Sequence, residues 1–151
     1  MTAPPATPTL DDAIVLAAQA HRSQIYPAPG GEPFILHPLR VMLHVETPAE
    51  RIVAVLHDLI EDTPHTLADL RCRGYPPAIV AALDLLTHRD VDTYDAYIAR
   101  LAPDPLARRV KLADLADNLA NNRRLPPTPD TPARIARYEQ AIASLHTAAA
   151  D

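Results

Sequence analysis

Residues 53–63 read Val53-Ala-Val-Leu-His57-Asp58-Leu-Ile-Glu61-Asp62-Thr63, an apolar segment that ends in ionisable side chains. Burying such side chains costs several kcal/mol each unless they are paired or bind a metal. On a helix, residues four apart share a face, so His57 would lie over Glu61 and Asp58 over Asp62. His57 and Asp58, about 100° apart around the axis, could converge on one ion in front of the helix. The alternative interpretation is a solvated helix turn that follows an apolar half.

An imidazole beside a carboxylate suits manganese, iron or zinc better than calcium. Glu61 and Asp62, one turn further on, could then orient or deprotonate a water on the ion. His37 precedes a proline, which favours extended geometry at the point where a loop enters a helix. Asp114 and Asn118 lie four apart on a later helix and need partners if they are buried. The alternatives are a structural histidine at position 37 and, for Asp114 and Asn118, a solvated helix face.

The composition indicates one soluble domain. The chain has 151 residues, of which 48% are hydrophobic and only 4% aromatic, so aliphatic side chains must fill the core. The net charge of −5 gives no electrostatic reason to expect a nucleic acid or an anionic membrane as partner. A single cysteine, Cys72, excludes an internal disulfide and fits a reducing compartment. Apolar runs fall short of the ~18 residues that cross a bilayer, so we expect a cytoplasmic protein.

Helix start signals divide the chain into helices with short loops. These signals are Thr or Asp caps, often with an acidic residue three positions later or a proline at the first helical position. Residues 1–8 are expected to form a flexible tail and 26–33 an irregular loop. Helices are expected over 13–22, 37–45, 48–63, 66–74, 77–87, 93–101, 105–123 and 131–146. The prediction is an all-α domain over residues 9–148, with seven or eight helices and no strand.

Motifs along the chain resemble those of the HD-domain alarmone hydrolases. In order they are His-x-x-Gln at 21–24, Pro-Phe-Ile-Leu-His-Pro at 33–38, Leu-His-Asp-x-x-Glu-Asp-Thr at 56–63 and Val-Lys-Leu-Ala-Asp-x-x-x-Asn at 110–118. That family comprises the hydrolase half of the RelA/SpoT proteins and small single-domain homologues. The resemblance covers residues 10–146 and implies a compact helical HD-domain fold. It further implies Mn²⁺-dependent hydrolysis of guanosine tetra- and pentaphosphate to GDP or GTP and pyrophosphate, the chemistry of the stringent response.

By position, the resemblance implies separate sets of residues for metal binding, water activation and nucleotide binding. The metal ligands would be His37, His57, Asp58 and Asp114, the water-handling pair Glu61 and Asp62, and the substrate contacts Asn118, Arg134 and Tyr138. Glu61 is the expected proton acceptor, and Asp62 is expected to orient the water. Other divalent transition metals are alternatives to manganese.

The chain departs from the family pattern where phosphates are bound. Tyr26 and Pro27 occupy the positions of a family Arg-Lys pair, His88 replaces a lysine, and Ala120 replaces an arginine. A charge-assisted phosphate contact contributes ~1.5–3 kcal/mol. Losing two or three such contacts weakens alarmone binding or indicates a different substrate.

Several other side chains near the motifs have a less specific interpretation. Arg123 and Arg124 are candidates to compensate partly for the lost cations. Lys111 could reach a phosphate, but a solvated side chain is the expectation. His21 is interpreted as a core histidine or as support for a ligand, rather than as a ligand.

Three functions are compatible with these observations. The first is a metal-dependent alarmone hydrolase, and the second is an HD phosphohydrolase that acts on NADPH or on a nucleoside mono- or diphosphate. The third is a non-catalytic nucleotide- or metal-binding module, against which the water-handling pair argues. The expected partner is a nucleotide rather than a nucleic acid polymer or a membrane, and the sequence leaves the oligomeric state open.

Overall fold

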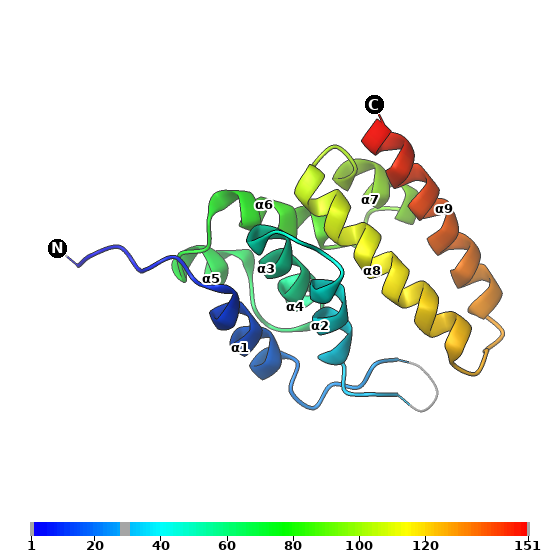
Figure 1. Ribbon diagram of the computed structural model, residues 1–151, viewed down its shortest axis with the longest axis horizontal. Coiled ribbons are helices and arrows are strands. Elements are labelled where there is room, and N and C mark those ends of the chain that lie inside the picture. The colour runs from blue at the N-terminus through cyan, green and yellow to red at the C-terminus, as the bar shows by residue number, and fades with distance from the viewer. Residues whose placement is uncertain (1, 28–30, 151) are drawn as a thin grey trace.

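The structure, a computed structural model, describes residues 2–27 and 31–150. Within these ranges the chain forms nine α-helices and no strand longer than an isolated β-bridge. The helices are α1 (Leu10–Ala20), α2 (Leu36–Leu43), α3 (Pro48–Leu56), α4 (Leu59–Asp62), α5 (Leu67–Cys72), α6 (Pro77–Leu86), α7 (Tyr94–Leu101), α8 (Pro105–Arg124) and α9 (Thr131–Ala150). The predicted all-α fold is confirmed, and its layout is shown in Figure 1.

Helix α3 forms the centre of the core. It contacts α1, α2, α6 and α8, and the side chains from Ile52 to Leu56 are all buried. Its start is fixed by a capping box in which Thr47 Oγ1 accepts from Glu50 N and Thr47 N donates to Glu50 Oε2. The same Glu50 side chain also accepts a hydrogen bond from Arg109 of α8. The cap therefore ties the start of α3 to the helix that supplies the other half of the site.

The predicted helix over 48–63 is wrong in one respect, because it breaks at His57 and Asp58 into α3 and α4. His57 N donates to the Ala54 carbonyl, three residues back, and the His57 ring Nδ1 lies 2.6 Å from the same oxygen. A side chain that competes for a backbone acceptor in this way disrupts the regular ladder. The break accounts for nine helices where seven or eight were expected, and it turns His57 and Asp58 toward α8.

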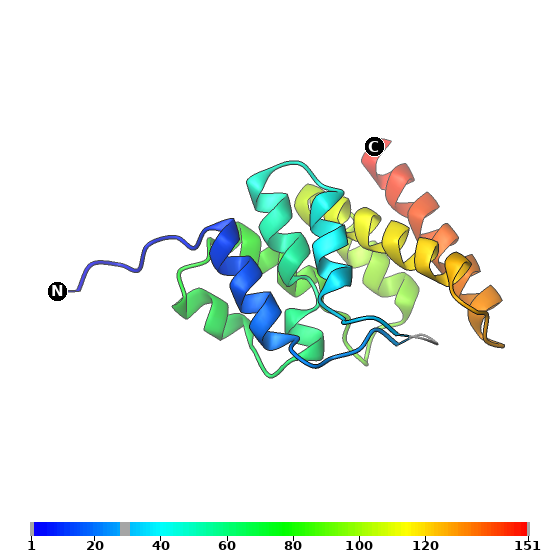
Figure 2. The same ribbon diagram turned by 60° about the horizontal axis from the view of Figure 1, so that its bottom comes forward.

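The two long helices α8 and α9 pack against each other at one end of the molecule, as both ribbon views show (Figures 1 and 2). Helix α8 also contacts α2, α3 and α6. It begins at Asp104, whose side chain accepts from Ala107 N, with a proline at the first position. Helix α8 therefore separates the core around α3 from the outer helix α9.

The segments on either side of the predicted irregular loop 26–33 are paired. Tyr26 N donates to Glu32 O and Phe34 N donates to Gln24 O, around an antiparallel bridge between Ile25 and Pro33. Residues 28–30 of this loop, and Met1 of the predicted tail 1–8, lie outside the described residues. The pairing presents Tyr26 to the core, where only 8% of its surface is exposed.

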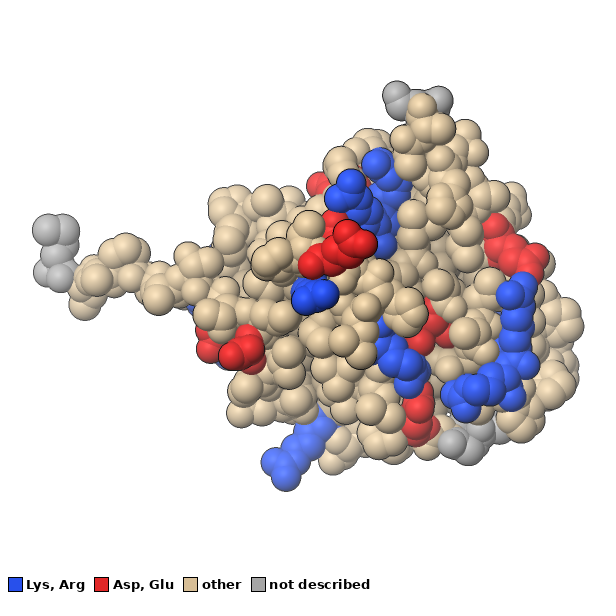
Figure 3. Space-filling view, viewed as in Figure 1, with Lys and Arg blue, Asp and Glu red and all other residues tan. Residues whose placement is uncertain are grey.

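The face of the molecule seen in Figure 3 carries charges of both signs. Figure 3 shows acidic and basic side chains lying next to one another on the face in view, without a continuous basic patch. None of the helices within residues 2–27 and 31–150 combines the length and apolar character needed to cross a bilayer.

Candidate metal centre and nucleotide cavity

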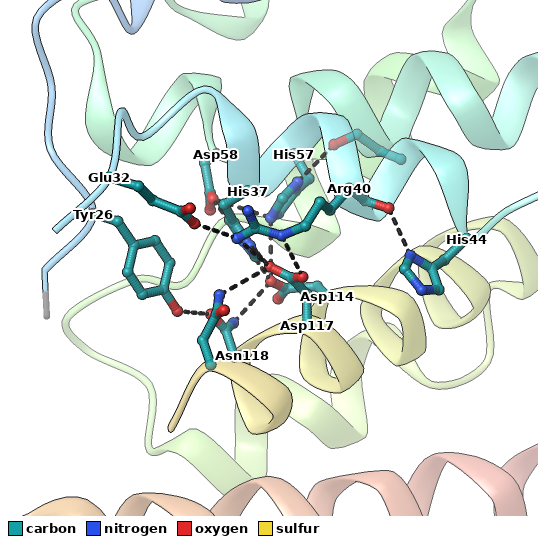
Figure 4. Close-up of polar contacts among 12 residues, drawn as sticks. Tyr26, Glu32, His37, Arg40, His44, His57, Asp58, Asp114, Asp117 and Asn118 are labelled. Carbon is teal, nitrogen blue, oxygen red and sulfur yellow. Dashed lines mark hydrogen bonds and ion pairs between the residues drawn. The ribbon is translucent and has the colours of Figure 1, made fainter. Parts of the chain in front are cut away.

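Histidine and aspartate side chains from α2, the α3–α4 junction and α8 converge behind the α2 helix (Figure 4). Nε2 of His37 lies 3.0 Å from Oδ1 of Asp114 and 3.5 Å from Oδ2 of Asp58. Nε2 of His57 lies 3.3 Å and 3.0 Å from the same two oxygens. The ligand atoms of His37, His57 and Asp58 all lie within 4.8 Å of one another, and Asp114 closes the group from the α8 side. The structure therefore brings together all of the predicted metal ligands.

His37 is held by Asp117, a residue to which sequence reasoning assigned no role. Its Nδ1 donates to Asp117 Oδ2 at 2.7 Å, since a carboxylate can only accept. Asp117 in turn accepts from Arg40 Nε and from Asn121 Nδ2. This arrangement, a carboxylate behind a histidine, fixes the imidazole tautomer and leaves Nε2 for an ion. The spacing of Asp117 three residues after Asp114 on one helix is the signal that could have indicated it.

His57 is oriented by the backbone. Its Nδ1 donates to the Ala54 carbonyl, so Nε2 is again the nitrogen that points at the cluster. This Nε2 is buried and forms no well-directed hydrogen bond among the described residues, although Asp58 Oδ2 is only 3.0 Å away. A buried nitrogen lone pair without a donor, beside two carboxylates, fits a divalent cation with nitrogen and oxygen ligands.

The electrostatics of the cluster favour positive charge at this point. Burial alone would lower the pKa of His37, but hydrogen bonds to Asp114 and Asp117 raise it to about 9. Burial likewise opposes charge on His57, yet Asp58 and Asp114 hold its pKa well above the usual value. The field that attracts a proton to these rings equally attracts a metal ion, which would compete with the protons.

Asp114 is held by neighbours on its own helix. Lys111 Nζ lies 2.8 Å from its Oδ2, and Asn118 Nδ2 donates to its Oδ1 at 2.9 Å. The expectation that Lys111 is solvated is wrong, because only 11% of its side chain is exposed and Nζ lies 5.1 Å above the Tyr97 ring. Burial disfavours the charged amine, but Asp114 keeps the pKa of Lys111 well above its usual value. The lysine therefore neutralises part of the negative charge of the cluster.

The predicted water-handling pair lies on α4, next to Asp58. Ligand atoms of Asp58, Glu61 and Asp62 lie within 4.8 Å of one another. Burial and the charge of Asp58 raise the pKa of Glu61, and burial with the charges of Asp58 and Glu61 raises that of Asp62 to about 6. Glu61 Oε1 accepts from His88 N at 2.5 Å, and only Glu61 of the pair lines the cavity described next.

A cavity of about 560 Å³ opens from the cluster toward α7 and α9. Its inner end contains the cluster together with Glu61 and Lys111. Its outer end lies between the second half of α8 and α9 and includes the predicted substrate contacts Arg134 and Tyr138. Arg134 is held by Asn122, which accepts from its Nε at 3.0 Å. The volume is that of an ordinary small-molecule site.

Three of the positions that depart from the family pattern, Tyr26, Pro27 and His88, line this cavity. Tyr26 and Pro27 form part of its wall, and the Tyr26 hydroxyl donates to Asn118 Oδ1 at 2.5 Å. Burial raises the pKa of Tyr26 to about 12, so the hydroxyl remains a donor. His88 turns its ring toward the Asp92 carbonyl, 3.0 Å from Nε2. The predicted nucleotide contact Asn118 is thus restrained from two sides, by Tyr26 and by Asp114.

The expected compensation by Arg123 and Arg124 is not seen. Arg123 pairs with Glu139 at 2.6 Å, Arg124 donates to Asn121, and neither lines the cavity. Arg124 reaches Asn121 one turn earlier on α8, and Arg123 reaches Glu139 on the facing helix α9. Both guanidinium groups are therefore used within the protein.

His21 supports the site without contacting the cluster. It is buried against Phe34, with ring centroids 4.8 Å apart, and its Nδ1 lies 2.8 Å from Gln24 Oε1. The amide of Gln24 donates to the Asp62 carbonyl at 2.9 Å. Burial lowers the pKa of His21, which keeps the ring neutral. His21 and Gln24 therefore brace the end of α4, in line with the supporting role expected from the sequence.

The all-α architecture matches the HD-domain fold that the sequence predicted, and the histidine–aspartate cluster lies within it. A solved structure described as a metazoan orthologue of SpoT that hydrolyses ppGpp matches it with a TM-score of 0.72 and 23% identity. The match covers 96% of this chain and 88% of that one, which shows that the two share a fold. No protein-family model matches the chain.

Curated relatives identify the group to which the chain is related. It is 33% identical over 149 residues to the bifunctional (p)ppGpp synthase/hydrolase SpoT of Escherichia coli, covering 89% of this chain and 21% of that protein. It is 30% identical over 129 residues to the GTP pyrophosphokinase of Streptomyces coelicolor, of which it spans only 15%. The guanosine-3′,5′-bis(diphosphate) 3′-pyrophosphohydrolase MESH1 of Mus musculus is 29% identical over 137 residues, 76% of its length. The predicted resemblance to the HD-domain alarmone hydrolases is confirmed.

Proposed function

We propose that the chain is a metal-dependent pyrophosphohydrolase that removes the 3′-pyrophosphate of guanosine tetra- or pentaphosphate, giving GDP or GTP and pyrophosphate. The observation that carries the proposal is the convergence of His37 Nε2 and His57 Nε2 on the oxygens of Asp58 and Asp114, at 3.0–3.5 Å. The relatives add the substrate, since SpoT and MESH1 are named for action on ppGpp or guanosine-3′,5′-bis(diphosphate). Mn²⁺ is the proposed ion, because mixed imidazole and carboxylate ligands suit a divalent transition metal.

The roles of the protein residues follow from their places in the cavity. His37, His57, Asp58 and Asp114 would hold the ion, which supplies Lewis-acid chemistry at the scissile phosphate. Glu61 borders both the cluster and the cavity, and its raised pKa suits a group that takes a proton from the attacking water. Asp62, whose carboxylate lies within 4.8 Å of those of Asp58 and Glu61, would orient that water.

The nucleotide would lie in the outer part of the cavity. Asn118, held by Tyr26 and Asp114, presents a fixed amide, and Arg134 and Tyr138 border the outer end from α9. A nucleotide held there would have its 3′ end toward the cluster, which favours reaction by proximity.

The test is direct. The chain is loaded with Mn²⁺ and incubated with guanosine tetraphosphate, NADPH, GTP, GDP and GMP, and the products are separated by anion-exchange chromatography. We expect GDP and pyrophosphate from guanosine tetraphosphate only, and no product after treatment with a chelator. Release of phosphate from NADPH or GMP, with guanosine tetraphosphate left intact, would replace this function with the second one.

A further inference from the structure

Arg137, on α9, is an arginine of the cavity wall for which the proposed function has no role. Its guanidinium carbon lies 4.8 Å from the ring centroid of Tyr94 and 5.6 Å from that of Tyr138. It forms neither an ion pair nor a hydrogen bond with the part of the chain that the structure describes, whereas other arginines are paired with acids: Arg40, Arg89, Arg100, Arg109 and Arg123. A guanidinium that lies over aromatic rings without an ion pair keeps its N–H donors free for an anion.

Tyr94 adds a second free group at the same place. Its hydroxyl is buried and has no hydrogen-bond partner among residues 2–27 and 31–150. The neighbouring Tyr97, with a ring centroid 6.0 Å away, instead donates to the Leu86 carbonyl at 2.7 Å. Burial raises the pKa of Tyr94, so its hydroxyl remains a neutral donor. A buried hydroxyl without a partner in a cavity wall is the kind of group that a ligand satisfies.

These groups are continuous with the metal cluster. Asp114 pairs with Lys111, and Lys111 lies over the Tyr97 ring. Tyr97 packs beside Tyr94, and the guanidinium of Arg137 lies over the Tyr94 ring. The substrate of the proposed reaction has two diphosphate groups, and the cluster accounts for the one that reacts. Arg137, a cation in the wall of the same cavity, is placed to meet the other.

We propose that Arg137 and Tyr94 form a subsite for the 5′-diphosphate of the nucleotide, in place of the missing Arg-Lys pair. Arg137 supplies a charged fork to the phosphate oxygens, and the Tyr94 hydroxyl donates a further hydrogen bond. The inference rests on the proposed function for the identity of the nucleotide. It moves the phosphate-binding charge from the segment around Tyr26 and Pro27 to the outer helix α9.

Binding of two reaction-related probes to the Mn²⁺-loaded chain tests the subsite without relying on turnover. Calorimetry measures the affinities for GDP, which carries a 5′-diphosphate, and for guanosine, which lacks it. For Arg137→Gln we expect GDP affinity to fall roughly ten- to hundredfold and guanosine affinity to stay unchanged. The GDP affinity of Arg137→Lys should lie between those of the parent chain and Arg137→Gln, because lysine keeps the charge but loses the forked guanidinium. The matched control is Arg123→Gln, an exposed arginine paired with Glu139 outside the cavity, which should leave both affinities unchanged.

Tyr94→Phe should weaken GDP binding severalfold without lowering the melting temperature, since the lost hydroxyl has no partner within the described protein. In turnover assays Arg137→Gln should raise KM for guanosine tetraphosphate by the same factor and leave kcat close to that of the parent chain. Unchanged GDP affinity in Arg137→Gln overturns the subsite, and so does an equal loss for guanosine, which would indicate base stacking. A chain that hydrolyses no guanosine tetraphosphate but still loses GDP affinity on Arg137→Gln would defeat the proposed function alone.

Discussion

Asp117 Oδ2 lies 2.7 Å from His37 Nδ1, on the side of the ring that faces away from the cluster. This contact decides that Nε2, rather than Nδ1, is the nitrogen available to an ion. We predict that Asp117→Asn weakens Mn²⁺ binding by about 10–100-fold, as is typical when a carboxylate behind a ligand histidine is removed. Competition with a fluorescent chelator measures the affinity. Asp84→Asn, in an exposed pair with Arg89, should leave that affinity unchanged, and equal affinities in all three proteins would contradict the orientation role.

The metal ligands themselves should be indispensable for binding. His57 lies close to Asp58 and Asp114, and Asp114 lies close to His37 and His57. His57→Ala and Asp114→Ala should therefore abolish stoichiometric metal binding. Elemental analysis after gel filtration measures the metal content, and circular dichroism checks that each variant is folded. Full metal content in both folded variants would show that the ion binds elsewhere.

Glu61 and Asp62 should differ in their effects on catalysis. We expect Glu61→Gln to keep the metal and lose about 10²–10⁴-fold in kcat, the usual contribution of a general base. Asp62→Asn should have the smaller effect, because Asp62 does not line the cavity while Glu61 does. Steady-state rates with guanosine tetraphosphate give the comparison. If Asp62→Asn proves the more damaging change, the two roles are reversed.

The pH dependence of stability should differ between the metal-free and the metal-loaded protein. The pKa of His37 is raised to about 9, because hydrogen bonds to Asp114 and Asp117 outweigh burial. A raised histidine pKa stabilises the fold fully below about pH 6.5, and this contribution is lost as the pH rises to about 9. Chelator-treated protein should therefore melt at progressively lower temperature across that range. Over the same range the melting temperature of metal-loaded protein should rise relative to that of chelator-treated protein, because metal binding requires deprotonated histidines. If the melting temperatures of the two forms change with pH in parallel, protons and metal do not compete for these histidines.

Tyr26 is expected to act through Asn118. Tyr26→Phe removes the hydroxyl that donates to Asn118 Oδ1 and keeps the ring packed against Phe34. Loss of one neutral hydrogen bond is worth ~1 kcal/mol, so KM for guanosine tetraphosphate should rise severalfold with little change in kcat. Steady-state kinetics of Tyr26→Phe and of the parent chain give the changes in KM and in kcat separately. A fall in kcat with unchanged KM would place Tyr26 in the chemical step instead.

The sequence predicted the parts of the fold that depend on local signals. Capping boxes are present at Thr9, Thr47 and Thr66, and the helices that follow them begin at Leu10, Pro48 and Leu67, against expected starts at residues 13, 48 and 66. The break at His57 was missed because it arises from a side chain that takes its own helix's acceptor, which periodicity does not reveal.

The candidate ligands could also be predicted, because histidine and aspartate in an apolar context need a partner. Tyr94 and Arg137 could not be predicted, because they resemble ordinary surface residues in the sequence. The burial of Lys111 likewise depends on its packing over Tyr97, a residue on another helix. Their roles follow only from contacts between helices that are distant along the chain.

The candidate ligands are drawn from α2, the α3–α4 junction and α8, so an ion bound by them would cross-link segments that are far apart in the sequence. Such a cross-link stabilises the folded state in proportion to the logarithm of the free ion concentration. Resistance to a protease would then report how much metal the surroundings supply. A cell depleted of that metal would lose the protein itself by degradation, and not merely its turnover.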